Sequence, residues 1–310
     1  MSQDALALMH QATRGSTKKK YKSIEKKWLQ HCTTENISRI TTTTTFSNFL
    51  ASEFGRNLSY GYIKGYTAAL ADYIKEVDFQ AINQLKKGMH NVRPPKAKYC
   101  VIWDVNNVLT FLSAMRTDTP MFLSQKVATL LMILSGNRVN MLSHMKITHM
   151  VISEEECVFQ FEDPLKHTRE GFKTDIMRYR AYPDKTLCPV HAIATYLGHR
   201  NSLCGDPNLF ITTVSPYRKA HHDTIARWIK EVLCASGIDT RTYQAHSCRA
   251  ASTSIAALAG VSLSTIIKSA SWCNVSTFKR FYHKEIADYY DVEEQNFGQA
   301  LLNQYADSMG

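Results

Sequence analysis

The sequence predicts an α+β protein that is mostly helical, with a small all-α N-terminal domain and an α-rich C-terminal domain carrying a small three-stranded antiparallel sheet. Three observations support this fold class. Apolar residues recur with helical spacing on both sides of a Pro-Pro pair. Three strand-like runs lie close together in the second half. A chain of 310 residues, 44% of them hydrophobic, can form two packed cores.

The N-terminal domain is expected over residues 18–90, after a disordered segment at residues 1–17. Its first helix follows from the helical spacing of Tyr21, Ile24, Trp28 and Leu29. A run of threonines at residues 41–45 is poor inside a helix but suitable for capping the next one, which should end near Gly55. The same apolar spacing predicts helices over residues 60–73 and 85–89.

Residues 91–98 are expected to be a linker, because Pro94 and Pro95 disfavour helix on both sides. Three basic residues in it, Arg93, Lys96 and Lys98, would suit a strap along a phosphate backbone. An ordinary solvated hinge explains the same composition equally well.

The C-terminal domain is expected over residues 99–293, followed by an acidic tail at residues 294–310. Helical periodicity marks residues 101–115, 121–134, 190–196, 224–234 and 247–259. Gly237 and Gly260 are suitable C-terminal caps for the last two helices. The predicted strands are residues 147–152, 157–161 and 174–181, and a polar loop joins the second to the third.

Charge is distributed unevenly along the chain. Residues 1–98 hold 16 lysines and arginines against 7 acids, a net charge of +9, and residues 285–310 hold six acids and no base. The segment between them carries +7 of the +10 total. Excess base in both halves suits a protein that binds a polyanion along most of its length, although solvated lysines are also common on intracellular proteins.

Other composition features exclude several classes. No apolar run approaches the roughly 18 residues that a membrane helix needs. The N-terminus lacks the basic region and apolar length of a signal peptide, so an intracellular, soluble protein is expected. The eight cysteines include no Cys-x-x-Cys pair, which argues against a zinc site, and the chain length and the missing signal peptide argue against a disulfide framework.

Several phosphate-binding side chains occur in order along the C-terminal domain. His246 and Arg249 stand three apart at a predicted helix start, so they leave from neighbouring positions on one face. Arg138 follows Gly136, where one helix breaks and another begins. Arginine forks can stabilise the transition state of in-line attack on a phosphodiester without a metal.

Tyr282 is the predicted nucleophile. A free phenol has a pKa near 10, so at neutral pH it needs a proton acceptor and a positive field, which His246 and the two arginines could provide. Tyr289 and Tyr290 are the rival candidates, although packing or hydrogen bonding at the start of the acidic segment explains them better.

These residues stand in the segments Ala245-His-Ser-Cys-Arg-Ala-Ala-Ser-Thr-Ser254, Ala270-Ser-Trp272 and Thr277-Phe-Lys-Arg-Phe-Tyr-His283. These segments resemble the corresponding motifs of the tyrosine recombinases (phage integrase family), and they are most similar to those of the recombinases of eukaryotic DIRS-like and Crypton-like mobile elements. The resemblance covers nearly the whole chain. It implies that residues 18–90 are a core-binding domain and residues 99–293 the catalytic domain.

The resemblance also assigns further site residues. It implies that Lys166, on the predicted hairpin loop, protonates the departing 5′ oxygen, with Lys173 and Arg169 as nearby alternatives. It implies that Trp272 donates to the scissile phosphate, although a buried core tryptophan is the simpler explanation. One departure is Met141, which stands where the family often has an acidic residue that braces the site.

The implied activity is site-specific cutting and rejoining of duplex DNA through a 3′-phosphotyrosine and a Holliday junction, with no cofactor, metal or ATP. Tetramers on DNA, docking of the 294–310 tail on a neighbouring protomer, and a nuclear location in a eukaryotic host (cytoplasmic otherwise) are further expectations. The predicted DNA contacts are Lys18, Lys19, Lys20, Lys22, Lys64, Lys86, Lys87, Arg93, Lys96 and Lys98. The alternatives are a type IB topoisomerase-like enzyme, and a domesticated mobile-element protein that binds DNA without cutting it.

Overall fold

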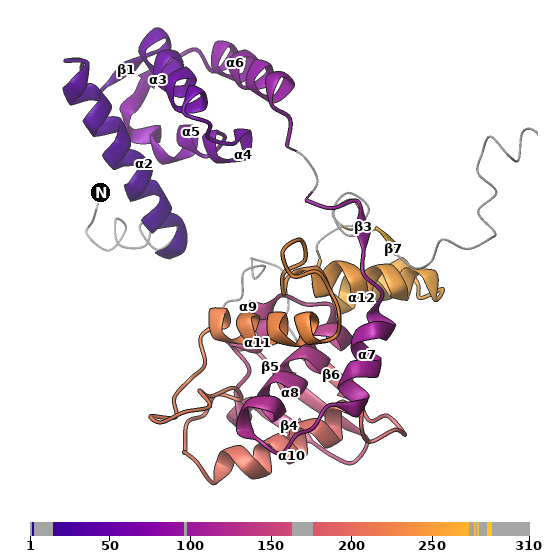
Figure 1. Ribbon diagram of the computed structural model, residues 1–310. Helices are drawn as coiled ribbons and strands as arrows, with labels where there is room; N and C mark the ends of the chain where they lie inside the picture. The colour runs from indigo at the N-terminus through magenta and orange to yellow at the C-terminus, as the bar shows by residue number, and fades with distance from the viewer. Residues whose placement is uncertain are drawn as a thin grey trace, which may run out of the picture. The chain divides into compact units, whose positions relative to one another are not determined.

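The chain separates into two compact units, residues 1–97 and residues 98–310 (Figure 1). The computed structural model describes residues 2, 15–95, 98–162, 176–272, 276, 278 and 284–286. The division falls near the end of the predicted linker, residues 91–98. Helix α6 (Phe79–Val92) occupies the first two of those residues.

The N-terminal unit is built around helices α2 (Gly15–Thr34), α3 (Thr43–Gly55) and α6. Helix α2 begins three residues before the predicted start at Lys18, and α6 is longer than the predicted residues 85–89. The threonine run caps as predicted, because the Thr42 side chain accepts a hydrogen bond from the Thr45 N–H.

Two predictions for this unit need correction. Residues 60–73 form three short pieces instead of one helix: α4 (Tyr60–Ile63), α5 (Tyr66–Ala69) and the 3₁₀ turn η1 (Ala71–Tyr73). Glycines at 61 and 65 weaken a continuous helix, since each costs about 1 kcal/mol relative to alanine. The unit is also not purely helical, because β1 (Thr41–Thr42) and β2 (Ile74–Glu76) pair in parallel.

A buried carboxylate fixes α2, α3 and α5 to one another. Glu53 is 1% exposed and accepts hydrogen bonds from Tyr66 Oη at 2.6 Å and Lys27 Nζ at 3.1 Å, while Arg56 Nη1 lies 2.8 Å away. Burial alone would raise the pKa of Glu53, but these hydrogen bonds and cations outweigh it and lower the pKa. The three helices are therefore held in one arrangement by polar as well as apolar contacts.

The C-terminal unit contains the longer helices α7 (Val105–Ala114), α8 (Pro120–Ser135), α10 (Pro189–Asn201), α11 (His222–Ala235) and α12 (Ser247–Leu258). The sequence predicted a helix from residue 101, but residues 101–104 are not helical. Val101 and Ile102 form β3, which pairs with β7 (Glu285–Ile286), and Asp104 caps α7. Short helices α9 (Val139–Leu142) and α13 (Leu263–Ser269) flank the candidate site.

The predicted three-stranded antiparallel sheet is confirmed, in the order β4 (Met150–Ile152), β5 (Glu156–Gln160), β6 (Ile176–Arg180). The 3₁₀ turn η2 (Ile147–His149) takes the first half of the first predicted strand. Alternation leaves Cys157, Phe159, Met177 and Tyr179 buried on one face.

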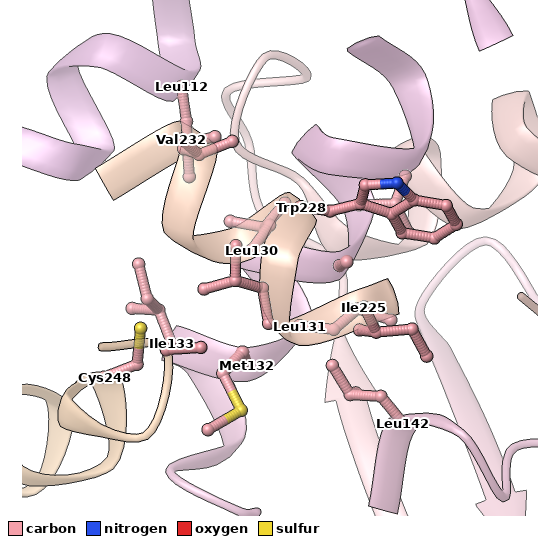
Figure 2. Packing of buried hydrophobic residues seen from close by; sticks show 14 of the residues in the cluster. Leu112, Leu130, Leu131, Met132, Ile133, Leu142, Ile225, Trp228, Val232 and Cys248 are labelled. Atoms are coloured by element: carbon pink, nitrogen blue, oxygen red, sulfur yellow. The ribbon is translucent and has the colours of Figure 1, made fainter. Parts of the chain in front are cut away.

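Helix α8 is the central element of the larger core. Its side chains from Leu130 to Ile133 meet Ile225, Trp228 and Val232 of α11 and Cys248 of α12 (Figure 2). From Leu123 to Ile133 every residue of α8 is buried. Among the described residues, no helix has both the length and the apolar character to cross a membrane.

Candidate active site

Arg249 is buried inside the C-terminal unit, at the third residue of α12. Its side chain is 0% exposed, and Nη1 donates a hydrogen bond to the Gly136 carbonyl at 3.1 Å. The guanidinium lies over the Trp272 ring, 4.4 Å from the centroid. A buried charge is tolerated only when its surroundings supply partners, and these contacts fix the plane of the fork.

Gly136 makes this approach possible because it ends α8 in the left-handed conformation. Its φ of 59° suits glycine, and its N–H donates to the Met132 carbonyl. A Cβ at this position would lie 3.1 Å from Cγ2 of Thr253 on α12. The missing side chain therefore lets the end of α8 pack closely against the helix that carries Arg249.

Arg138 lies two residues after Gly136 and is the N-cap residue of α9. It is half-buried, and its Nη1 is shielded from solvent without a hydrogen-bond partner among the described residues. Native proteins rarely leave a buried donor unsatisfied, and a ligand-binding role is one of the recognised reasons. The sequence prediction that Arg138 lies where a helix breaks and restarts is confirmed.

Trp272 closes one side of the Arg249 pocket. It follows α13, is 5% exposed, and packs against Phe278 with ring centroids 5.4 Å apart. Asn137 fastens the same region to the Arg138 segment, because its Nδ2 donates to the Ser269 carbonyl at 2.7 Å. Sequence reasoning missed Asn137, although a polar residue between a cap glycine and an arginine was a possible signal.

His246 precedes α12 as its N-cap residue and is exposed, in contrast to Arg249 three positions later. The predicted placement of both at the start of one helix is confirmed. Ser247 fixes this helix start by accepting a 2.9 Å hydrogen bond from Trp103 Nε1. Burial raises the pKa of Cys248 to about 12, so its thiol stays protonated and is a poor nucleophile.

Tyr282 and Lys166 lie outside the described residues, as do Lys173, Arg169, Tyr289, Tyr290 and the 294–310 tail. On the two sides of Tyr282, the structure describes Ser276 and Phe278 before it and residues 284–286 after it. Phe278 packs on Trp272, and the Lys284 N–H donates to Ser254 Oγ on α12 at 3.0 Å. Met141, at the position where an acid was expected, is 3% exposed and belongs to the apolar core.

Several predicted DNA contacts gather on one part of the N-terminal unit. Lys20 Nζ lies 5.1 Å from the Tyr62 ring centroid, on the segment that also carries Lys64. Lys86 donates a hydrogen bond to Thr67 Oγ1, and burial together with the charge of Lys64 lowers its pKa. The other lysines of this unit that were predicted to contact DNA are Lys18, Lys19, Lys22 and Lys87.

Arg93 is engaged within its own unit. It donates to the carbonyls of Phe54 and Leu58 at 3.0 and 3.2 Å and to Asn57 Oδ1 at 3.1 Å, and it stacks on the Phe54 ring. Lys98 is exposed at the start of the other unit, and Lys96 lies outside the described residues.

Metal-type ligands come together once within the described part of the chain. His221, His222 and Asp223 at the start of α11 have ligand atoms within 4.8 Å of one another. The Nδ1 of His221 already accepts from the Asp223 N–H at 3.4 Å. The group includes neither Arg138 nor Arg249.

No protein-family model matches the sequence, and no curated protein matches it. Solved structures do match. XerH site-specific recombinase in a post-cleavage complex with palindromic difH substrate is 14% identical, with a TM-score of 0.57 over 88% of this chain and 73% of that one. Lambda integrase, as a dimer bound to a COC′ core site, is 14% identical with a TM-score of 0.57 over 93% and 95%.

The Tn1549 transposon integrase, in complex with transposon right end DNA, is 13% identical with a TM-score of 0.55 over 86% of each chain. All three are tyrosine recombinases, and the likeness shows that this chain shares their fold. The finer similarity to recombinases of DIRS-like and Crypton-like elements stays a prediction.

Proposed function

We propose that the protein is a site-specific DNA recombinase that cuts and rejoins duplex DNA through a covalent phosphotyrosine. The observation that carries the proposal is the buried Nη1 of Arg138, which has no hydrogen-bond partner among the described residues and lies two residues from the carbonyl that accepts from Arg249. Two arginines fixed around one α8–α12 junction can bind the non-bridging oxygens of a single phosphodiester. The shared fold with recombinases captured on DNA supports the same activity.

In the proposed reaction, Tyr282 Oη attacks the scissile phosphorus while the bond to the 5′ oxygen breaks. His246 takes the phenol proton, and Lys166 gives a proton to the departing 5′ oxygen. Arg138 and Arg249 stabilise the charge of the pentacoordinate transition state. The phosphotyrosine keeps the energy of the broken bond, so a 5′-hydroxyl from a partner strand can reverse the step without ATP or a metal.

The choice of Tyr282 rests on its neighbours in the chain. Phe278, four residues earlier, packs on Trp272, which covers Arg249. The backbone N–H of Lys284, two residues later, donates a hydrogen bond to Ser254 Oγ. Two residues of extended chain span at most about 7 Å. Because Phe278 and Lys284 both contact the unit that carries Arg138 and Arg249, we expect the attacking tyrosine to come from the same chain as the two arginines.

DNA would be bound by both units. Lys20, Lys64 and Lys86 lie around residues 62–67 of the N-terminal unit, where burial and, to a smaller extent, the charge of Lys64 lower the pKa of Lys86. A phosphate backbone would relieve this repulsion. Assembly as a tetramer, docking of the tail on a neighbour and nuclear residence belong to the same proposal.

The test is covalent trapping on nicked duplexes that carry the sequences flanking the gene, with and without EDTA. Wild type should give a DNA-linked band on a denaturing gel in both conditions, and Tyr282→Phe should give none. Tyr289→Phe is the matched control and should react like wild type.

Each rival predicts a different result. Salt-sensitive DNA binding without a covalent band would favour a domesticated DNA-binding protein. Relaxation of supercoiled plasmid by a monomer, without exchange between sites, would favour a type IB topoisomerase-like enzyme. A band that survives in Tyr282→Phe and disappears in Tyr289→Phe would assign the nucleophile elsewhere.

A further inference from the structure

A second polar cavity lies in the C-terminal unit, at the opposite end of α8 from Arg138. It is an open pocket with a volume of about 280 Å³, and it is lined by the end of α7, the first half of α8, the segment before α10 and the first turns of α10. Helices α8 and α10 run side by side there (Figure 1). Lys126 lines it ten residues before Gly136, which is about 15 Å along a helix axis.

Lys126 is the unusual residue of this cavity. It is 8% exposed, and it makes no hydrogen bond or ion pair with any described residue. Asp184 attracts it electrostatically, but Asp184 Oδ1 already accepts hydrogen bonds from the Thr186 N–H and Oγ1. Burial lowers the pKa of Lys126. Its stem is buried while the ammonium faces the open pocket, so an anion that enters the pocket can form a charge-assisted hydrogen bond with it.

The other lining residues that can carry a charge are basic, like Lys126. Lys185 and His191 contribute further cationic or titratable groups. Helix α10 is 13 residues long and begins at the cavity, with Cys188 as N-cap and Pro189 as its first residue. His191 and Ala192 line the wall from its first turn, where the helix dipole is positive. Asp184 is the opposing charge, placed just before Lys185.

We propose that this cavity binds a small organic phosphate, with the phosphate on Lys126 and the organic part against Met115, Leu123 and Ala192. The phosphate would supply the partner that Lys126 lacks, and the three apolar side chains leave room for a compact body. The site shares no residue with the Arg138–Arg249 pocket. It therefore stands whether or not the protein cuts DNA.

The first test is calorimetric titration of the full-length protein with phenyl phosphate and with sodium pyrophosphate, at matched ionic strength. Lys126→Met should weaken phenyl phosphate binding at least about tenfold, because the charged partner is lost while the packing volume is kept. Lys75→Met removes an exposed lysine from the other unit and should change the affinity less than about twofold.

Arg138→Ala separates this cavity from the candidate active site, which also attracts phosphates. Binding that disappears in Arg138→Ala and persists in Lys126→Met would overturn the proposal, and so would the absence of binding at millimolar concentration. A stronger response to pyrophosphate than to phenyl phosphate would contradict the apolar part of the site.

A measurement on wild type removes any dependence on how the variant folds. An amine with a lowered pKa is more nucleophilic at neutral pH, so Lys126 should be acetylated by a water-soluble acylating reagent. Phenyl phosphate should slow that labelling several-fold, as followed by mass spectrometry of peptides, and leave Lys75 unchanged. Equal labelling of Lys126 with and without phenyl phosphate would refute the site.

Discussion

Arg200 and Arg138 are two arginines of the same unit with opposite surroundings. Arg200, at the end of α10, is 1% exposed, and each nitrogen of its guanidinium group donates a hydrogen bond within the protein. Nε donates to the Asn208 and Leu209 carbonyls, both at 3.1 Å, Nη1 donates to Asn201 Oδ1 at 2.9 Å, and Nη2 donates to the Asp206 carbonyl. Arg138 has a buried Nη1 with no such partner among the described residues.

The difference shows what makes a guanidinium structural or functional. The segment from Asp206 to Leu209 folds around Arg200 and supplies carbonyl oxygens at the distances its donors need. Arg138 is the N-cap residue of α9, and its buried Nη1 has no hydrogen-bond acceptor within the part of the chain that the structure describes. A saturated arginine stabilises a loop, whereas one with a remaining donor can bind a phosphate.

The largest effect should come from Arg138→Ala. Loss of one transition-state donor is expected to slow covalent cleavage of a nicked duplex about 10²- to 10³-fold. The thermal unfolding temperature should change little, since the half-buried side chain holds few protein partners. Arg116→Ala, an exposed arginine in the same unit, is the control and should cleave normally. A comparable loss of stability in Arg138→Ala would remove the contrast with Arg200.

Arg200→Met should do the reverse. It removes the donors to the buried Leu209 carbonyl and to the part-buried carbonyls of Asp206 and Asn208, and a buried group left unsatisfied costs about 1–3 kcal/mol before relaxation. We expect the free energy of unfolding by urea to fall by about 3 kcal/mol. Cleavage per folded molecule should stay near that of wild type. Normal stability with lost cleavage would place Arg200 in the reaction.

Gly136→Ala is a smaller change that connects the backbone to the site. The left-handed φ of 59° and the 3.1 Å approach to Thr253 Cγ2 should together cost about 1–2 kcal/mol. Thr253→Ser removes Cγ2 and keeps the hydroxyl that donates to the Arg249 carbonyl. In a double-mutant cycle, the serine should therefore recover part of the lost stability. Simple additivity would show that only the backbone conformation matters.

The sequence by itself determined most of the fold class. Helical periodicity predicted α8, α11 and α12 with ends within two residues, because buried apolar faces repeat with the helix period, whereas α10 continues five residues beyond its predicted end at residue 196. It also predicted the three antiparallel strands and the placement of Arg138, His246 and Arg249 at helix starts. It failed at residues 60–73, where two glycines interrupt a pattern that the periodicity alone treats as continuous.

Only the tertiary structure decided which charged groups lack partners. Nothing in the sequence separates Arg200 and Lys126 from ordinary surface cations, and Arg93, which the sequence places among the DNA contacts, binds residues 54–58 in the structure. Whether a cation is satisfied depends on acceptors brought from other elements, such as the loop around Arg200 or the Gly136 carbonyl beside Arg249. Local periodicity does not contain that information, because hydrogen bonds between distant elements are set by packing.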